Sequence, residues 1–137
     1  MEQHSSMIEQ TELVVSKWLY NPPVNSIEEA GEELTSFISF DVMKKRAANK
    51  KGIACRFTIE FAFEKQTLLE YTGENSYVID LHDVIDRNEL STMIRNTYTL
   101  FKEKFDLRKS ATVLWNKSLL PFDESNYDLG PVLELLQ

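Results

Sequence analysis

The alternation of apolar and polar side chains over residues 53–64 constrains the fold more than any other feature of the chain. Apolar side chains occupy every second position there, namely Ile53, Cys55, Phe57, Ile59, Phe61 and Phe63. A period of two residues is that of a β-strand, whose successive side chains point to opposite faces of a sheet. The pattern predicts one strand of an antiparallel sheet that is covered on one face and exposed to solvent on the other.

Three further segments have the composition of strands: residues 13–20, 34–43 and 68–81. Pro22 and Pro23 end the first of them, because proline has no amide hydrogen to donate to a neighbouring strand. The last segment contains Gly73 and is predicted to be interrupted at residues 73–75 by a bulge or a tight turn. Residues 44–52 are rich in Lys and contain one Asn and one Gly that suit turn geometry, so they are predicted to form a hairpin loop.

Helical periodicity replaces the strand pattern after Asp86. Side chains at three- and four-residue spacing form one stripe, made of Leu90, Met93, Ile94, Thr97, Tyr98, Phe101 and Phe105. Asp86 and Glu89 have the spacing of a capping box, so a helix is predicted over residues 87–109. A loop at residues 119–123 and a short helix opened by Gly130 and Pro131 follow. The order predicts an α+β fold, with a four-stranded antiparallel sheet followed by a long helix and a short C-terminal helix.

The length of 137 residues favours one domain, which we expect to span residues 12–137. Residues 1–11 show neither periodicity nor turn chemistry and are expected to be a flexible N-terminal leader. No apolar stretch approaches the roughly 20 residues of a membrane span, and the polar start does not resemble a signal peptide, so a cytoplasmic protein without membrane insertion is expected.

Charge is unevenly distributed along the chain. The net charge is −7, yet residues 44–51 carry five Lys or Arg and no acid. This basic island could contact phosphates, but it contains no aromatic residue on which a base could stack. A solvated hairpin tip is the favoured interpretation, and nucleic acid is not the expected partner.

Residues that could perform catalysis are scarce. The single cysteine, Cys55, lies in the apolar register of its strand and is expected to be a buried structural thiol. His82 has Asp80 and Asp83 as neighbours, but side chains so close in sequence at a strand end diverge, and a surface turn is favoured. The four glycines are isolated from one another, so no phosphate-binding loop is present. We expect no enzyme activity, no cofactor and no metal site.

Aromatic residues are more numerous than one sheet face and one helix stripe need to bury, with eight Phe, five Tyr and two Trp. Several of them lie beside prolines or in loops: Trp18, Tyr20, Trp115, Phe122 and Tyr127. They form either the edges of an ordinary core or an exposed apolar groove or oligomer interface.

The order of elements and the landmarks between them resemble the SecB-like chaperones, a family that includes the protein-export chaperone SecB and relatives attached to toxin–antitoxin systems. The resemblance covers residues 12–137 and includes the aromatic and proline-containing segment at residues 18–24 and the Leu-Pro loop at residues 119–123. The chain departs from the family in having no proline near the start of its long helix, a longer segment at residues 110–117 and no basic, metal-binding tail. These departures favour a chaperone or adaptor with a dedicated client over one that delivers proteins for export.

The resemblance implies an ATP-independent chaperone that holds unfolded or partly folded client polypeptides in an apolar groove. The groove residues that it implies are Trp18, Tyr20, Val24, Phe122, Tyr127, Leu133 and Leu136. It also implies that Glu60 and Glu64 lie on an acidic, partner-facing surface of the sheet. Members of the family form tetramers as pairs of dimers, so a homotetramer or a dimer is expected, with first strands and long helices at the contacts.

Two other functions are compatible with the sequence. One is a non-enzymatic adaptor or immunity-type protein that binds one folded partner through its acidic surface. The other is a small nucleic-acid binder that uses residues 44–51. Binding to many denatured proteins would distinguish a chaperone from an adaptor, and a steep salt dependence on oligonucleotides would indicate the third function.

Overall fold

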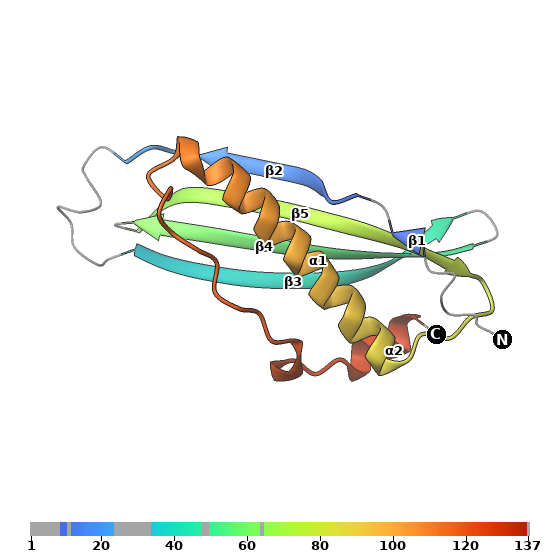
Figure 1. Cartoon of the computed structure of the whole chain (residues 1–137). Helices are drawn as coiled ribbons and strands as arrows, with labels where there is room; N and C mark the ends of the chain where they lie inside the picture. The colour runs from blue at the N-terminus through green and yellow to red at the C-terminus, as the bar shows by residue number, and fades with distance from the viewer. Residues whose placement is uncertain (1–8, 11, 24–33, 48–49, 64, 137) are drawn as a thin grey trace.

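The computed structural model describes residues 9–10, 12–23, 34–47, 50–63 and 65–136 (Figure 1). Its elements in chain order are β1 (Glu9–Gln10), β2 (Val14–Tyr20), β3 (Leu34–Ala47), β4 (Lys50–Phe63), β5 (Gln66–Asp80), α1 (Arg87–Arg108), the 3-10 turns η2 (Lys109–Ala111) and η3 (Glu124–Asn126), and α2 (Gly130–Leu136). Helix α1 crosses one face of the sheet diagonally, and α2 lies near the end at which α1 begins (Figure 1).

The sheet is antiparallel and four strands wide. Strands β3, β4 and β5 pair in sequence order, and both β1 and β2 pair with β5 on the side that β4 does not occupy. Strand β3 therefore forms one edge of the described sheet, and β1 and β2 together form the other. Together with α1 and α2, this arrangement confirms the fold predicted from the sequence.

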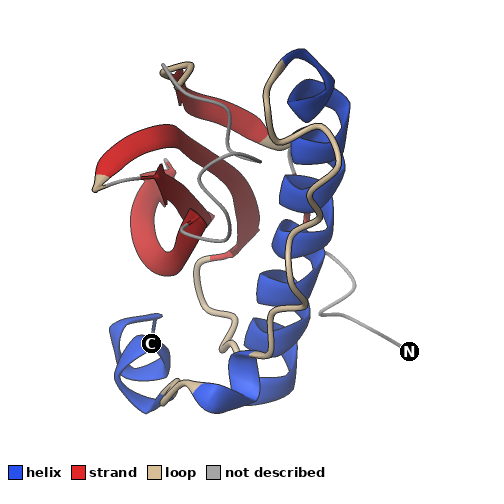
Figure 2. Cartoon of the chain, turned by 90° about the vertical axis from the view of Figure 1, so that its left-hand side faces the viewer, coloured by secondary structure: helices blue, strands red, loops and turns tan. Residues whose placement is uncertain are grey.

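The sheet is twisted, and α1 lies along one side of it, as Figure 2 shows. The residues that alternate along β4 divide as predicted: Phe57, Ile59 and Phe61 are buried toward α1, whereas Thr58 and Glu60 are only partly buried on the outer face. The α1 stripe is buried at all seven predicted positions. Asp86 and Glu89 form both hydrogen bonds of the predicted capping box, which fixes the first turn of α1.

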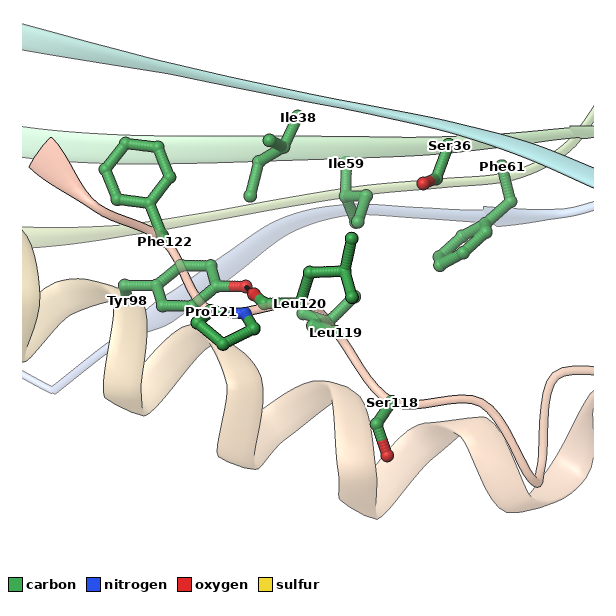
Figure 3. Close-up of a pocket in the computed structure, with 10 residues that line it drawn as sticks. All are labelled: Ser36, Ile38, Ile59, Phe61, Tyr98, Ser118, Leu119, Leu120, Pro121 and Phe122. Carbon is green, nitrogen blue, oxygen red and sulfur yellow. Dashed lines mark hydrogen bonds between the residues drawn. The ribbon is translucent and has the colours of Figure 1, made fainter. Parts of the chain in front are cut away.

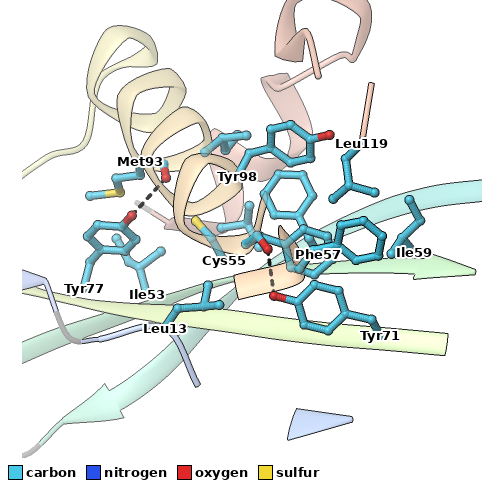
Figure 4. Close-up of a cluster of buried hydrophobic side chains, with 14 of the residues drawn as sticks. Leu13, Ile53, Cys55, Phe57, Ile59, Tyr71, Tyr77, Met93, Tyr98 and Leu119 are labelled. Atoms are coloured by element: carbon cyan, nitrogen blue, oxygen red, sulfur yellow. Dashed lines mark hydrogen bonds between the residues drawn. The ribbon is translucent and has the colours of Figure 1, made fainter. Parts of the chain in front are cut away.

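Two aromatic residues of β5 fasten α1 to the sheet (Figure 4). The Tyr77 hydroxyl donates to the carbonyl oxygen of Met93 at 2.9 Å, and the Tyr71 hydroxyl donates to that of Phe101 at 2.8 Å. The burial of Cys55 in this core, at 0% exposed, confirms its predicted role as a buried thiol. Burial also raises the pKa of Cys55 to about 12, although a hydrogen bond with Thr97 opposes the shift.

Three sequence predictions need correction. Glu9 and Gln10 belong to β1 and pair with Val78 and Tyr77 of β5, so they are not part of a flexible leader, while residues 1–8 and 11 lie outside the described residues. Strand β5 is not interrupted at residues 73–75, because its pairing with β4 continues through Gly73. The register instead shifts at two other places: Ser16 is the extra residue of β2, between Val15 and Lys17, and Leu68 is the extra residue of β5, opposite Phe61 and Ala62.

The third correction concerns the predicted hairpin loop at residues 44–52. Strands β3 and β4 continue through most of it, since β3 ends at Ala47 and β4 begins at Lys50. Pairing of Lys44 with Ile53 and of Lys45 with Gly52 extends the ladder, which sequence composition had not indicated. The basic island therefore lies on the ends of two strands.

Candidate functional site

A half-open apolar pocket of about 200 Å³ lies between the sheet and the segment that connects α1 to α2 (Figure 3). Its lining residues come from β3, β4, α1 and the connecting segment: Ser36, Ile38, Ile59, Phe61, Tyr98, Ser118, Leu119, Leu120, Pro121 and Phe122. Ile38 lies opposite Ile59 in the β3–β4 register, and Ser36 lies opposite Phe61. The small side chain of Ser36 leaves space that a larger residue at this position would fill.

Phe122 joins the pocket to a cluster of aromatic rings. Its ring lies 4.9 Å from that of Phe57, 5.2 Å from that of Phe40 and 5.2 Å from that of Tyr127, measured between centroids. Phe40 also meets Tyr127 edge to face at 4.8 Å. Phe40 and Phe122 are partly buried and Tyr127 is exposed, so the cluster presents aromatic surface beside the pocket and along β3.

The connecting segment is tied to α1 by polar contacts. The Tyr98 hydroxyl donates to the carbonyl oxygen of Leu120, and burial raises the pKa of Tyr98 to about 12. Arg95 faces the buried carboxylate of Glu124 at 3.6 Å. Lys109 donates to the carbonyl oxygen of Lys117 at 2.6 Å, so the segment runs back along the helix.

Trp18 and Tyr20 lie at the other edge of the sheet, on β2. The Trp18 ring packs edge to face on Tyr71 at 5.3 Å, and Arg108 lies over it at 5.6 Å. The Tyr20 hydroxyl accepts a hydrogen bond from the Val113 amide at 3.0 Å. Phe122 and Tyr127, in contrast, contact Phe40 of β3, at the opposite edge of the sheet. Within one chain, the groove residues implied by the resemblance therefore do not form a single groove.

The remaining groove residues have separate environments. Leu133 is partly buried and packs against the core, and Val24 lies outside the described residues. Leu136 is fully buried, so its assignment to an open groove was wrong for this chain, since it completes the core at the end of α2. Lys51 reinforces that end, because its ammonium group donates to the carbonyl oxygens of Leu136 and Asp83, both at 3.0 Å.

The outer face of the sheet carries paired charges. Glu60 accepts a hydrogen bond from the Thr67 hydroxyl, and Glu64 lies outside the described residues. Glu74 contacts Lys45 at 3.0 Å and Arg56 at 3.2 Å. Burial opposes the shift, but these two hydrogen bonds hold the pKa of Glu74 below its ordinary value. The acids of this face are thus partly neutralised within the chain.

The basic island is also engaged inside the chain. Lys45 contacts Glu74, Lys50 contacts Asp80 at 2.8 Å, and Lys51 is buried against backbone carbonyls. These contacts reduce the positive potential that a nucleic acid would meet. His82 lies in an exposed turn, as the sequence indicated.

The described part of the chain offers neither a membrane-spanning helix nor a metal-binding cluster. No helix among these residues is long and apolar enough to cross a membrane. No group of three or more His, Cys, Asp or Glu side chains within the same residues is arranged to hold a metal ion.

Sequence reasoning identified Phe122 and Tyr127 but missed Phe40, Ser36 and Ile38 as their neighbours. Ser36, Ile38 and Phe40 alternate with the intervening residues, so the period of a strand puts the three on one face of β3. Their contact with a segment about eighty residues later depends on how the chain returns along α1, which no local pattern encodes.

Comparisons with known proteins bear on the fold. No family model matches the sequence, and no curated protein matches it. Among solved structures, a SecB-like chaperone of Mycobacterium tuberculosis in complex with a ChAD peptide from the HigA1 antitoxin is similar, with a TM-score of 0.59 and 12% identity over 87% of this chain and 93% of that chain. A protein of unknown function from Streptococcus agalactiae has a TM-score of 0.44 and 8% identity over 85% of this chain and 96% of that one. The similarity to the M. tuberculosis protein shows that the chain has a SecB-like fold.

Proposed function

We propose that this protein is an ATP-independent chaperone that binds extended apolar segments of unfolded or partly folded polypeptides. The observation that carries the proposal is the half-open apolar pocket with the rings of Phe40, Phe122 and Tyr127 beside it. The fold supports it, because the similar M. tuberculosis chaperone was solved with a bound peptide.

The position of the pocket suits a ligand without a defined sequence. Strand β3 forms an edge of the sheet, and the backbone groups of an edge strand can pair with an extended chain whatever its side chains. The pocket beside it can accept bulky apolar side chains by burial, which is not directional. Binding of this kind needs no nucleotide. Affinity for unfolded clients lowers the concentration of free unfolded chains by mass action, so fewer of them aggregate.

We further propose that the protein assembles into dimers or tetramers through the opposite edge of the sheet. Val14 and Leu19 on β2 are 58% and 46% exposed, which is unusual for apolar residues on a strand. Trp18 and Tyr20 also lie on β2. In an assembly through this edge, they would add to the client-binding surface.

Filling the pocket tests the proposed function. Ser36→Leu places an apolar side chain in the pocket, and Ser39→Leu is the matched control, because residue 39 lies three positions away on the outer side of the same strand. The ligand is reduced and alkylated lysozyme, a permanently unfolded and cationic chain, and binding is measured by fluorescence anisotropy. We expect Ser36→Leu to weaken binding by about tenfold, roughly 1.4 kcal/mol, and Ser39→Leu to change it by less than twofold.

Two results would contradict the proposal. Absence of binding to the unfolded chain by the wild-type protein would exclude the chaperone function and favour an adaptor for a folded partner. Equal affinities of the two leucine variants would place the binding surface away from this pocket. Light scattering from an aggregating client checks that binding also prevents aggregation.

A further inference from the structure

We infer that Phe37 contacts the outward-facing side chain of a client segment bound along β3, and that the protein therefore selects segments with consecutive apolar residues. The inference rests on the proposed function for the presence of that segment beside the pocket. It goes further by naming a second recognition element, on the face of the sheet opposite the pocket, and the class of segment that satisfies both elements.

Strand β3 is left open for pairing where it passes the pocket. Residues 34–43 contain no Lys, Arg or Pro, and Asp41 is the only charged residue among them. Natural sheets protect their edges with charged side chains, Lys above all, and with proline. Along β3 such protection begins only at Lys44, whereas the opposite edge carries Lys17 in the middle of β2. The stretch of β3 beside the pocket therefore has the composition of a strand that pairs with a further strand.

Phe37 lies on the outer face of the sheet, between two residues of the pocket. Ser36 and Ile38 line the pocket on the covered face (Figure 3). Phe37 pairs with Glu60 of the outer face, and a strand directs successive side chains to opposite faces, so its ring points away from the pocket. The ring is 64% exposed, which is a large apolar exposure for an edge strand. Three consecutive residues of β3 thus present apolar surface on both faces of the sheet.

The neighbours of Phe37 on the outer face leave its ring uncovered. Those next to it along β3 and those diagonal to it on β4 all have short side chains: Thr35, Ser39, Thr58 and Ala62. Glu60, directly opposite, is engaged by the Thr67 hydroxyl. The ring therefore protrudes above the surface at the edge where a further strand would pair.

Pairing geometry converts this arrangement into a client pattern. Residues opposite one another in neighbouring strands point to the same face of a sheet. A client residue opposite Phe37 would place its side chain against the ring, and the two residues beside it in the client would point toward the pocket, next to Ser36 and Ile38. Apolar contact on both faces thus requires consecutive apolar residues in the client.

Consecutive apolar residues identify a particular class of segment. Strands that a native protein buries on both faces are nearly continuous apolar runs, whereas strands with one solvated face alternate. Water reaches the first kind only when the client is unfolded. Contact on both faces of β3 therefore favours segments that a folded client would hide completely.

Two fluorescein-labelled peptides of identical composition test the pattern. Both contain two Val, one Leu and a background of Ser, Thr and Gly, but the apolar residues are consecutive in the first peptide and alternate with Thr in the second. Phe37→Thr removes the ring and keeps a β-branched residue suited to a strand. Val84→Thr is the matched control, because Val84 is 68% exposed and lies outside the pocket lining, before α1. Fluorescence anisotropy measures the affinity of each pair.

We expect Phe37→Thr to weaken binding of the consecutive peptide by about three- to fivefold, as the loss of a cross-strand apolar contact predicts. The alternating peptide should lose less than twofold, because its apolar side chains all face the pocket. Val84→Thr should change the affinity for either peptide by less than twofold. Light scattering should give Phe37→Thr the same mass as the wild-type protein.

Three results would overturn the inference while the proposed function stands, which binding of reduced and alkylated lysozyme by the wild-type protein establishes. They are an equal effect of Phe37→Thr on the two peptides, failure of the wild-type protein to bind the consecutive peptide, and a lower mass of Phe37→Thr. The last result would show that a second copy of the chain covers the ring. If the wild-type protein binds neither lysozyme nor the peptides, the proposed function fails and the inference fails with it.

Discussion

The ring of Tyr71 on β5 lies parallel to the ring of Phe101 on α1, with 4.1 Å between centroids and 4° between planes. The Tyr71 hydroxyl also donates to the backbone carbonyl of Phe101, so one residue supplies both the apolar and the polar contact. This pair sits at the centre of the sheet–helix interface, beside Phe105 and Phe57. It fixes where α1 crosses the sheet, and therefore where the segment that connects α1 to α2 returns over β3.

Gly73 leaves room for this interface, and Gly73→Ala is expected to destabilise the protein. A Cβ at residue 73 would lie 3.0 Å from a methyl carbon of Leu13 and 3.1 Å from the ring of Phe101. Both neighbours are buried, so they cannot move away without disturbing the core. We expect a loss of about 1 to 3 kcal/mol in the free energy of unfolding by urea. Gly130→Ala is the control, since among the described residues the only close neighbour there is the side chain of the exposed Asp128, and a comparable loss in this variant would contradict the argument.

The two faces of β4 should differ sharply in their tolerance of substitution. Phe61→Ala removes a buried ring that stacks on Phe105, and we expect it to cost about 3 to 5 kcal/mol. Thr58→Ala loses only a hydrogen bond with the Thr72 hydroxyl on the outer face and should cost about 1 kcal/mol or less. Urea denaturation midpoints measure both effects. Equal midpoints would show that the assignment of the two faces is wrong.

The sequence predicts those parts of the structure whose pattern lies within a single strand or helix. The buried stripe of α1 and the alternation of β4 were predicted residue by residue, because each is a periodicity within one element. Gly73 was misread as a break, since a glycine needed for the close approach of Phe101 resembles one needed for a turn. The candidate site was predicted only in part, through Phe122 and Tyr127.

The rest of the site depends on contacts between distant segments. Ser36 and Leu120 line one pocket although eighty-four positions separate them, and their own neighbours in sequence do not indicate it. Leu136, in contrast, was assigned to the groove but lies in the core. An apolar residue in a short terminal helix can face either, and its sequence does not decide between them. The ammonium group of Lys51, on a distant strand, holds the carbonyl of Leu136 at the core side.

Stability should fall in alkaline solution because buried groups keep their protons in the folded state. Burial raises the pKa of Cys55 from 9.0 to about 12, and burial also raises the pKa values of Tyr77 and Tyr98 to about 12. The unfolded chain releases these protons at lower pH than the folded chain, so the stabilisation is complete below about pH 9 and is lost as pH rises toward 12. For one group the slope approaches about 1.4 kcal/mol per pH unit.

Urea unfolding at a series of pH values between 8 and 11 would measure this loss. Cys55→Ala should reduce the slope of the free energy of unfolding against pH just above pH 9, because the thiol is the first of these groups to ionise in the unfolded chain. At higher pH the tyrosines should still cause a loss of stability in this variant. A free energy of unfolding that stays constant from pH 8 to pH 11 would disagree with the burial of these groups.

Assembly through β2 predicts a solution mass above that of the single chain. Leu19 is 46% exposed and lies on an edge strand, where an apolar side chain invites contact with a second copy. Light scattering at micromolar concentration should therefore give the mass of a dimer or a tetramer, and Leu19→Lys should shift it toward the 15.9 kDa monomer. Phe37→Lys is the matched control, because Phe37 is 64% exposed on the opposite edge, β3, and this variant should keep the assembled mass. A monomeric wild-type protein would reject the assembly, and dissociation caused only by Phe37→Lys would move the interface to β3, the edge proposed to receive the client.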